Sequence, residues 1–281
     1  MHRWKIGNVN ITRVVDDVAT WIGQFILPQA TPEAVQSIPW LAPFLDPEGR
    51  LVISIHALIV ESCGRRILVD TCLGNGKERP IVPEWHLRST PFLADLAKAG
   101  APRESIDIVL CTHLHIDHVG WNTMRVNDRW LPTFPNSRYL FARAEWEYWK
   151  DQPEDYGPVI TDSVRPIVDA GLVDLVETDH EITDEVRLEP TPGHTPGHVS
   201  VRIRSAGEDA VITGDVMHHP CQIAHPEWST VLDHDSDESV RTRRAFLKRC
   251  ARAPVLVIGT HFTTPTAGRI VGEGNGYRFE P

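Results

Sequence analysis

Short apolar runs alternate with amphipathic stretches along most of the chain. The apolar runs are rich in Val, Ile and Leu and end at Gly, Pro, Asp or Thr, as buried strands do. They predict strands at 5–15, 53–61, 66–70, 106–111, 137–141, 172–176, 186–190, 199–203, 210–213 and 255–259. Helical periodicity predicts helices at 91–99, 143–150 and 239–251. Many strands and few helices favour packed sheets with the helices outside them.

Two segments lack a clear period. Residues 21–50 contain five prolines and several large apolar side chains, and residues 151–158 also carry bulky residues. Bulky residues do not suit a flexible linker, so we expect the first segment to be an ordered loop or short helix packed on the body. A length of 281 residues fits one domain over 1–281, with an N-terminal apolar loop extension at about 20–50.

Composition and charge narrow the class of protein. The net charge of −10 disfavours binding to nucleic acid or to anionic lipid. The five cysteines are odd in number and form no C-x-x-C motif, which favours a reducing cytoplasm over a disulfide framework. No apolar run is long enough for a membrane span or the core of a secretory signal, so we expect a cytoplasmic protein outside the membrane.

The chemistry concentrates in the motif HLHIDH, residues 113–118, which directly follows the apolar run IDIVLCT. His113 and His115 lie two residues apart in an extended segment, so both imidazoles can project to the same side and reach one ion. Asp117 and His118 follow in a tight turn that can point toward a second ion. Histidine is the usual nitrogen ligand of zinc, and this density of ligands predicts a metal site rather than a polar turn.

Three further candidate ligands occupy equivalent places in the chain. His194 follows the run VRLEP, Asp215 follows AVITG and His261 follows VLVIGT. Each is presented just after an apolar run, as the HLHIDH motif is. Ligand sites commonly form at the carboxyl ends of strands, so we expect these four strand ends to converge and to gather seven ligands.

The motifs HLHIDH, GHTPGH, TGD and GTHF, in this order and spacing, resemble the metallo-β-lactamase superfamily. The resemblance implies an α/β (α+β) fold, a four-layer αβ/βα sandwich. It implies one metal bound by His113, His115 and His194, and a second bound by Asp117, His118 and His261. Asp215 would bridge the two. Asp70 and His198 match positions that hold ligands in place by hydrogen bonds from behind.

The implied cofactor is two Zn²⁺ per chain. The donors are nitrogen and oxygen with no thiolate, a set that also accepts Mn²⁺, Fe²⁺ or Co²⁺. Zinc is preferred because histidine-rich sites and hydrolysis go together. A glutamate replaces the second histidine in the flavodiiron branch of the superfamily, and His115 argues against that branch.

We therefore expect a metal-dependent hydrolase that cleaves a lactone or ester of small size with a hydroxide held between two zinc ions. Asp117 would guide a proton to the leaving group. His218 stands where lactonases of the superfamily often have a tyrosine, so it would donate a hydrogen bond to the substrate carbonyl, and this departure puts an acyl-homoserine lactone substrate in doubt.

The substrate would lie against aromatic side chains. Phe25, Trp121 and Trp228 are candidates for an apolar pocket wall, with core or dimer-interface roles as the alternative. The C-terminal sequence resembles the branch with methyl parathion hydrolase and pyridoxolactone-type lactonases, which are commonly dimers, so a homodimer is an expectation. A phosphotriester hydrolase is the alternative activity. A β-lactamase, a nuclease and a non-catalytic metal-binding scaffold fit the sequence less well.

Overall fold

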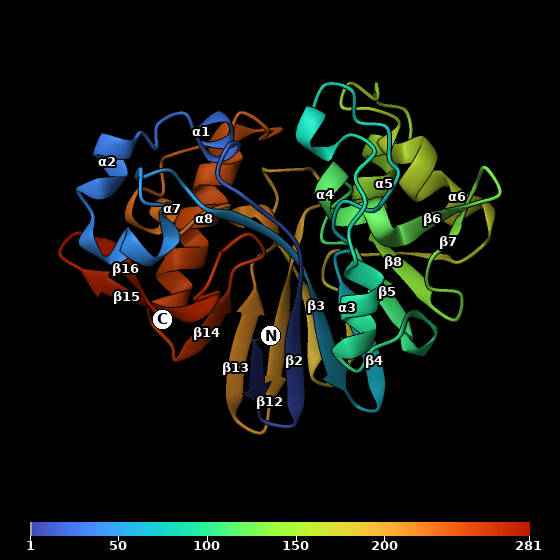
Figure 1. Ribbon diagram of the computed structural model, residues 1–281. Helices are drawn as coiled ribbons and strands as arrows, with labels where there is room; N and C mark the ends of the chain where they lie inside the picture. Colours follow the sequence, from blue (N-terminus) through green and yellow to red (C-terminus); the bar gives the residue numbers. More distant parts are fainter. Residues whose placement is uncertain (1) are drawn as a thin grey trace.

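The computed structural model describes residues 2–281, which form two seven-stranded sheets packed face to face (Figure 1). The first sheet has the order β1 (Arg3–Ile6), β2 (Val9–Ala19), β3 (Ile53–Ser62), β4 (Arg65–Val69), β5 (Ile108–Leu110), β8 (Arg138–Ala142) and β9 (Val173–Val176). The second has the order β10 (Glu181–Thr183), β11 (Val186–Pro190), β12 (Val199–Ser205), β13 (Glu208–Ile212), β14 (Val255–Ile258), β15 (Ala267–Glu273) and β16 (Gly276–Glu280). A small hairpin joins β6 (Thr123–Val126) to β7 (Arg129–Pro132).

Helices cover the outer face of each sheet, which makes four layers (Figure 1). Beside the first sheet lie α3 (Phe92–Lys98), α4 (Ile116–Val119), α5 (Arg143–Trp149) and α6 (Arg165–Asp169). Beside the second lie α1 (Gly23–Ile26), α2 (Pro32–Gln36), α7 (Cys221–Ala224) and α8 (Ser236–Cys250). Shorter helical turns are η1 (Pro39–Phe44), η2 (Pro83–Trp85), η3 (Arg103–Ser105), η4 (Gly120–Asn122), η5 (Ile160–Val164) and η6 (Gly214–Val216).

Alternation along the central strands builds two apolar cores. On β3, Leu58 and Val60 face β12 residues such as Val201 across the space between the sheets. Their neighbours Ala57 and Ile59 point the other way, into the larger core beneath the helices. Because β3 is buried on both faces, it reads as a nearly continuous apolar run. The sequence pattern therefore follows directly from the layered architecture.

Most predicted elements are present, with informative differences. The run predicted as one strand over 5–15 is split into β1 and β2 by a turn at Gly7, where φ is +57°. The edge strands β10 and β16, the neighbouring strand β15 and the β6–β7 hairpin were not predicted, because their half-exposed residues break the apolar pattern. The segment 21–50 is ordered, as predicted, and contains α1, α2 and η1.

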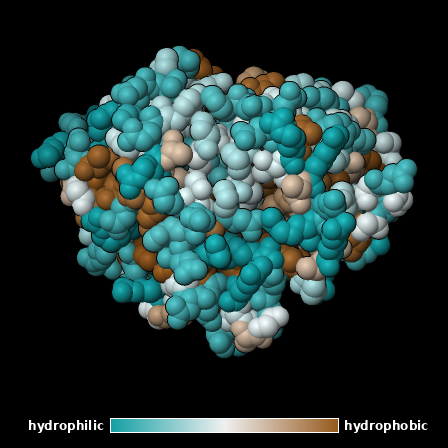
Figure 2. Space-filling model, turned by 180° about the vertical axis from the view of Figure 1, so that it is seen from behind, coloured by the Kyte–Doolittle hydropathy of each residue, from teal (hydrophilic) through white to brown (hydrophobic). Residues whose placement is uncertain are grey.

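The surface is mainly polar on the face that Figure 2 shows, where hydrophobic residues form small groups between hydrophilic ones. Among residues 2–281, no helix combines the length and the apolar character that crossing a bilayer requires.

Candidate metal centre

The predicted ligands meet at one end of the sandwich. The HLHIDH segment follows β5 and His194 follows β11, while Asp215 and His261 follow the parallel neighbours β13 and β14. The donor atoms form two compact groups, one of His113, His115 and His194 and one of Asp117, His118 and His261, in each of which all atoms lie within 4.8 Å of one another. The convergence of the four strand ends therefore agrees with the prediction.

The first group is made of three neutral rings. The Nε2 atoms of His113 and His194 each lie 3.0 Å from Nδ1 of His115. Burial lowers the pKa of His115 to about 4, and it lowers the pKa values of His113 and His194 well below the usual value. Neutral rings with several nitrogens turned toward one point are suited to binding a cation through their lone pairs.

The second group adds a carboxylate. Nε2 of His118 lies 3.2 Å from Nε2 of His261, and the two oxygens of Asp117 lie 3.6 Å from these two nitrogens. Burial opposes charge on His118, but the neighbouring carboxylates of Asp215 and Asp70 outweigh it and raise the pKa of that ring. The second group therefore favours a positive charge at its centre.

Asp215 lies between the groups. Its Oδ2 atom is 3.5 Å from Nε2 of His194 in the first group and 3.4 Å from Nε2 of His118 in the second. Burial would raise the pKa of this carboxyl, but the surrounding histidines, His261 and His118 first, hold it well below its usual value. Its Oδ1 atom is 3.2 Å from Nε2 of His261 in the second group, so an ionised carboxylate in this place faces both groups.

These residues fit a pair of divalent cations. The Oδ1 atom of Asp215 and both ring nitrogens of His218 are buried without a hydrogen-bond partner in the described residues. Buried polar atoms are rarely left unpaired, and a bound ion would satisfy them. Imidazole and carboxylate donors without thiolate suit Zn²⁺, and also Mn²⁺, Fe²⁺ or Co²⁺.

Asp70 and His198 lie behind the candidate ligands. Asp70, with φ of +59° at the end of β4, accepts hydrogen bonds from Nδ1 of His118 at 2.9 Å and from the backbone N–H of Thr112 at 2.8 Å. Nε2 of His198 accepts the backbone N–H of Asp215 at 2.7 Å. A Cβ on Gly214 would come within 2.5 Å of that same Nε2, so only glycine fits before Asp215.

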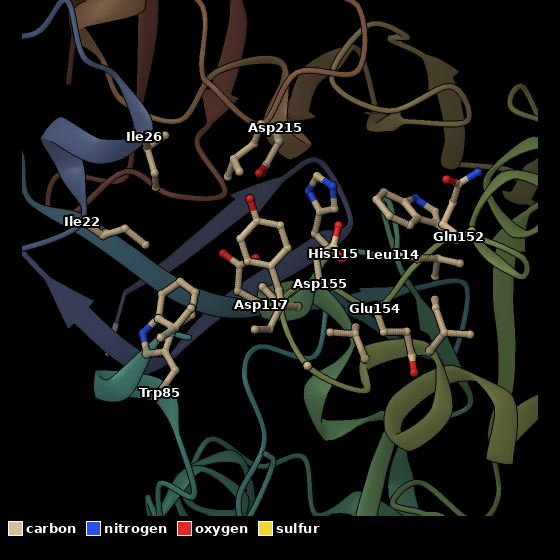
Figure 3. Close-up of a pocket in the computed structure, with 18 of the residues that line it drawn as sticks. Ile22, Ile26, Trp85, Leu114, His115, Asp117, Gln152, Glu154, Asp155 and Asp215 are labelled. Atoms are coloured by element: carbon tan, nitrogen blue, oxygen red, sulfur yellow. The ribbon is translucent and has the colours of Figure 1, made fainter. Parts of the chain in front are cut away.

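A cavity of about 290 Å³ opens onto the metal centre (Figure 3). Figure 3 shows Ile22, Ile26 and Trp85 on one side and Leu114, Gln152 and Glu154 on the other, with His115, Asp117 and Asp215 between them. The lining also includes Phe25, Tyr148, Trp149, Tyr156 and His218. The wall is largely apolar and aromatic, and its polar groups gather at the centre, which is the usual build of a small-molecule site.

The family model of the metallo-beta-lactamase superfamily matches residues 51–261, which include every candidate ligand of both groups. The chain belongs to the metallo-beta-lactamase superfamily. The fold agrees with this assignment, since the predicted four-layer sandwich is present in full.

Relatives of this superfamily member include lactonases. N-acyl homoserine lactonases of Bacillus cereus and of a Bacillus species are 26% and 30% identical over 180 residues, 60% of this chain and 65% of theirs. The match thus spans less than two thirds of those relatives. AidC, a dizinc quorum-quenching lactonase, has a TM-score of 0.81 at 20% identity, and the hydrolase AbOPH has 0.81 at 24% identity. Each comparison covers 100% of this chain and 96% of the other, and both show the same fold.

Two of the three predicted substrate-binding residues lie elsewhere. Trp121 is 4% exposed and stacks on Phe92 in the core, with ring centroids 5.7 Å apart. Trp228 stacks on His225 at 4.1 Å. Neither lines the cavity, so the prediction of a wall that contains these two tryptophans is wrong, and the core alternative holds for Trp121. Phe25 lines the cavity, in agreement with the prediction.

Two buried carboxylates at the site were not predicted. Glu145 on α5 accepts the backbone N–H groups of Leu114 and Gly197, at 3.1 and 2.9 Å, and so joins the HLHIDH segment to the GHTPGH segment. Asp233 accepts a hydrogen bond from Nδ1 of His194 at 3.0 Å. No local motif marks either residue. A glutamate on the buried face of an amphipathic helix was the one available signal for Glu145.

Proposed function

We propose that this superfamily member is a metal-dependent hydrolase that holds two divalent cations, zinc by preference, and cleaves uncharged lactones or esters. The observation that carries the proposal is the pair of ligand groups with the Asp215 carboxylate between them, next to an apolar cavity. Structural zinc sites are closed sets of four ligands, commonly with cysteine. Seven nitrogen and oxygen donors beside a cavity fit a catalytic centre better than a structural one.

Two side chains of the cavity are suited to handle the substrate. When bound, paired divalent cations lower the pKa of a shared water and polarise a carbonyl oxygen. Asp117, whose side chain is 16% exposed, lies both in the second ligand group and in the cavity wall, so it can pass a proton to the leaving group. His218 also lines the cavity. Its Nε2 atom lies 3.2 Å from Oδ2 of Asp215, whereas its Nδ1 atom has no partner among the described residues and can donate a hydrogen bond to a substrate oxygen.

The chemistry of the wall supports an uncharged substrate. Among the described residues that line the cavity there is no lysine or arginine, whereas Glu154 and Asp155 contribute carboxylates. A site without cationic side chains gives no partner to an anionic group at a distance from the metal centre. This favours neutral lactones and esters, and the N-acyl homoserine lactonases among its relatives act on lactones. It disfavours nucleic acid and substrates with a free carboxylate.

A phosphotriester is the second candidate substrate, because it too is uncharged and fits the same apolar cavity. Two bound cations would polarise a phosphoryl oxygen as well as a carbonyl oxygen. Comparing kcat/KM for a neutral aryl phosphotriester with kcat/KM for a lactone and for an aryl ester separates the two activities. We expect the lactone or the ester to give the higher value.

The experiment that tests the proposal is turnover before and after metal removal. Purified protein is assayed on lactones, aryl esters and phosphotriesters, then dialysed against a chelator, and then supplied with Zn²⁺, Mn²⁺ or Co²⁺. We expect activity to be lost on dialysis and restored by the ion. Full activity of the metal-free protein would overturn the proposal.

A further inference from the structure

The two ligand groups are supported from behind in the same way. In the second group, Nδ1 of His118 donates to Asp70 at 2.9 Å. In the first group, Nδ1 of His194 donates to Asp233 at 3.0 Å, and both side chains are at most 1% exposed. A carboxylate on one ring nitrogen fixes the tautomer and leaves the lone pair of the other nitrogen, Nε2, facing the ligand group.

The chain around Asp233 is tied closely to the segment that carries His194. The backbone N–H of His234 donates to the carbonyl of His194 at 3.0 Å, and that of Asp235 donates to Gly193 at 2.9 Å. These two bonds on neighbouring residues hold the two segments side by side. The carboxylate of Asp233 is therefore delivered to the imidazole by backbone pairing rather than by a flexible loop.

A buried cation accompanies this carboxylate. Arg243 on α8 is fully buried, and its Nη2 atom lies 3.9 Å from Oδ2 of Asp233. Its Nε–H donates to the carbonyl of Val216, the residue after Asp215, at 2.8 Å. A buried carboxylate is costly without a compensating charge, and Arg243 supplies one. The same guanidinium links the bridging position to the support of His194.

We propose that Asp233 is a positioning residue that sets the affinity of the first ligand group for its cation, as Asp70 does for the second group. The inference rests on the proposed two-cation function. It goes further, because it assigns one carboxylate support to each ion and predicts that the two supports act separately. The partner of Asp233 is a divalent cation, reached through His194.

The test measures Zn²⁺ affinity rather than turnover. Metal-free wild-type protein and the variant D233N are titrated with Zn²⁺ in competition with a chromophoric chelator. We expect two ions per chain in the wild type, and in D233N a loss of about 10- to 100-fold in the affinity of one ion with the other unchanged. D70N should weaken the other ion, and the double variant should weaken both.

A neighbouring aspartate provides the matched control. Asp235 is the N-cap of α8, and because asparagine caps a helix as well as aspartate does, D235N should leave both affinities unchanged. If D233N fails to fold, D233E, which keeps a carboxylate, takes its place and should weaken the same single ion. Unchanged affinities, or an equal loss for both ions, would overturn the inference. A wild type that binds fewer than two ions would instead overturn the proposed function.

Discussion

The metal centre and the wall of the cavity are built by opposite means. The candidate metal centre comes from strand ends, and most of its candidate ligands are buried and form hydrogen bonds to residues such as Asp70 and His198. The wall comes largely from two segments outside the sheets, around 22–26 and 152–160, which line opposite sides of the cavity (Figure 3). The sheets thus determine where cations can bind, and the added segments determine which molecule can approach them.

The wall is nevertheless firmly anchored at one side. The buried carboxylate of Asp162 in η5 accepts hydrogen bonds from both terminal nitrogens of Arg79, at 2.7 and 3.0 Å. Lys77 lies over the ring of Trp130 at 3.7 Å and donates to the carbonyl of Asp162 at 3.0 Å. These charges hold the segment that leads out of the cavity wall. The comparison therefore predicts that the two regions can be damaged separately.

Asp215→Ala should have the largest effect. It removes the carboxylate between the ligand groups, so we expect kcat/KM to fall at least about 10³-fold and the bound zinc to fall below two ions per chain. Metal analysis and turnover measure the two effects. E208Q, an exposed change on β13, is the control and should match the wild type. Normal metal content in the Asp215 variant would contradict the assignment of its role.

Arg79→Met should harm the wall and spare the centre. Removal of one partner of a buried ion pair costs about 3 kcal/mol of unfolding free energy, measured by urea denaturation of the metal-free protein. R125M breaks the exposed pair with Asp128 and should cost less than about 1 kcal/mol. Zinc content should stay the same in both. An R79M protein of normal stability would show that the pair does not anchor the wall.

His218→Ala lies at the boundary of the two regions. If His218 donates a hydrogen bond to the substrate, kcat should fall about 10- to 100-fold while the zinc content stays at two ions per chain. His218 also lies within ligand distance of His194 and Asp215. A fall in zinc content together with kcat would therefore assign the residue to the metal centre and refute the substrate role.

Comparing Phe25→Ala with Trp121→Ala distinguishes a residue of the cavity wall from a residue of the core. Phe25 is 56% exposed in the cavity wall, so its loss should raise KM for aryl or long-chain esters about tenfold with little change in stability. Trp121→Ala should do the reverse, with a loss of about 3 kcal/mol of stability and an unchanged KM in the folded protein. Equal KM changes in the two variants would mean that Phe25 does not contact substrate.

The smallest expected effect is a pH dependence of stability that comes from Lys77, which helps to anchor the wall. Burial lowers the pKa of Lys77 from 10.5 to about 7 in the folded protein. Between pH 7 and 8 the unfolded chain keeps this proton while the folded chain loses it, so stability rises with pH. Relative to K77M, the unfolding free energy should gain about 1 kcal/mol over that unit, by urea denaturation at each pH. An unchanged difference would contradict the lowered pKa.

The sequence predicted the metal centre better than the wall for a physical reason. HLHIDH, His194, Asp215 and His261 each follow an apolar run, and the strands that carry them end at the same end of the two packed sheets. No such rule applies to Trp121 and Trp228, because the sequence around an aromatic residue does not show whether its side chain packs in the core or lines a pocket. Asp233 and Glu145 were missed because their partners, His194 and Leu114, are distant in the sequence.

The most direct test of the central claim is a zinc-loaded crystal structure with anomalous scattering at the zinc edge. We predict two peaks, one within about 2.0–2.2 Å of donor atoms of His113, His115 and His194, and one at the same distance from those of Asp117, His118 and His261. Asp215 should contact both. A single peak, or peaks bound by other residues, would contradict the proposed two-cation site.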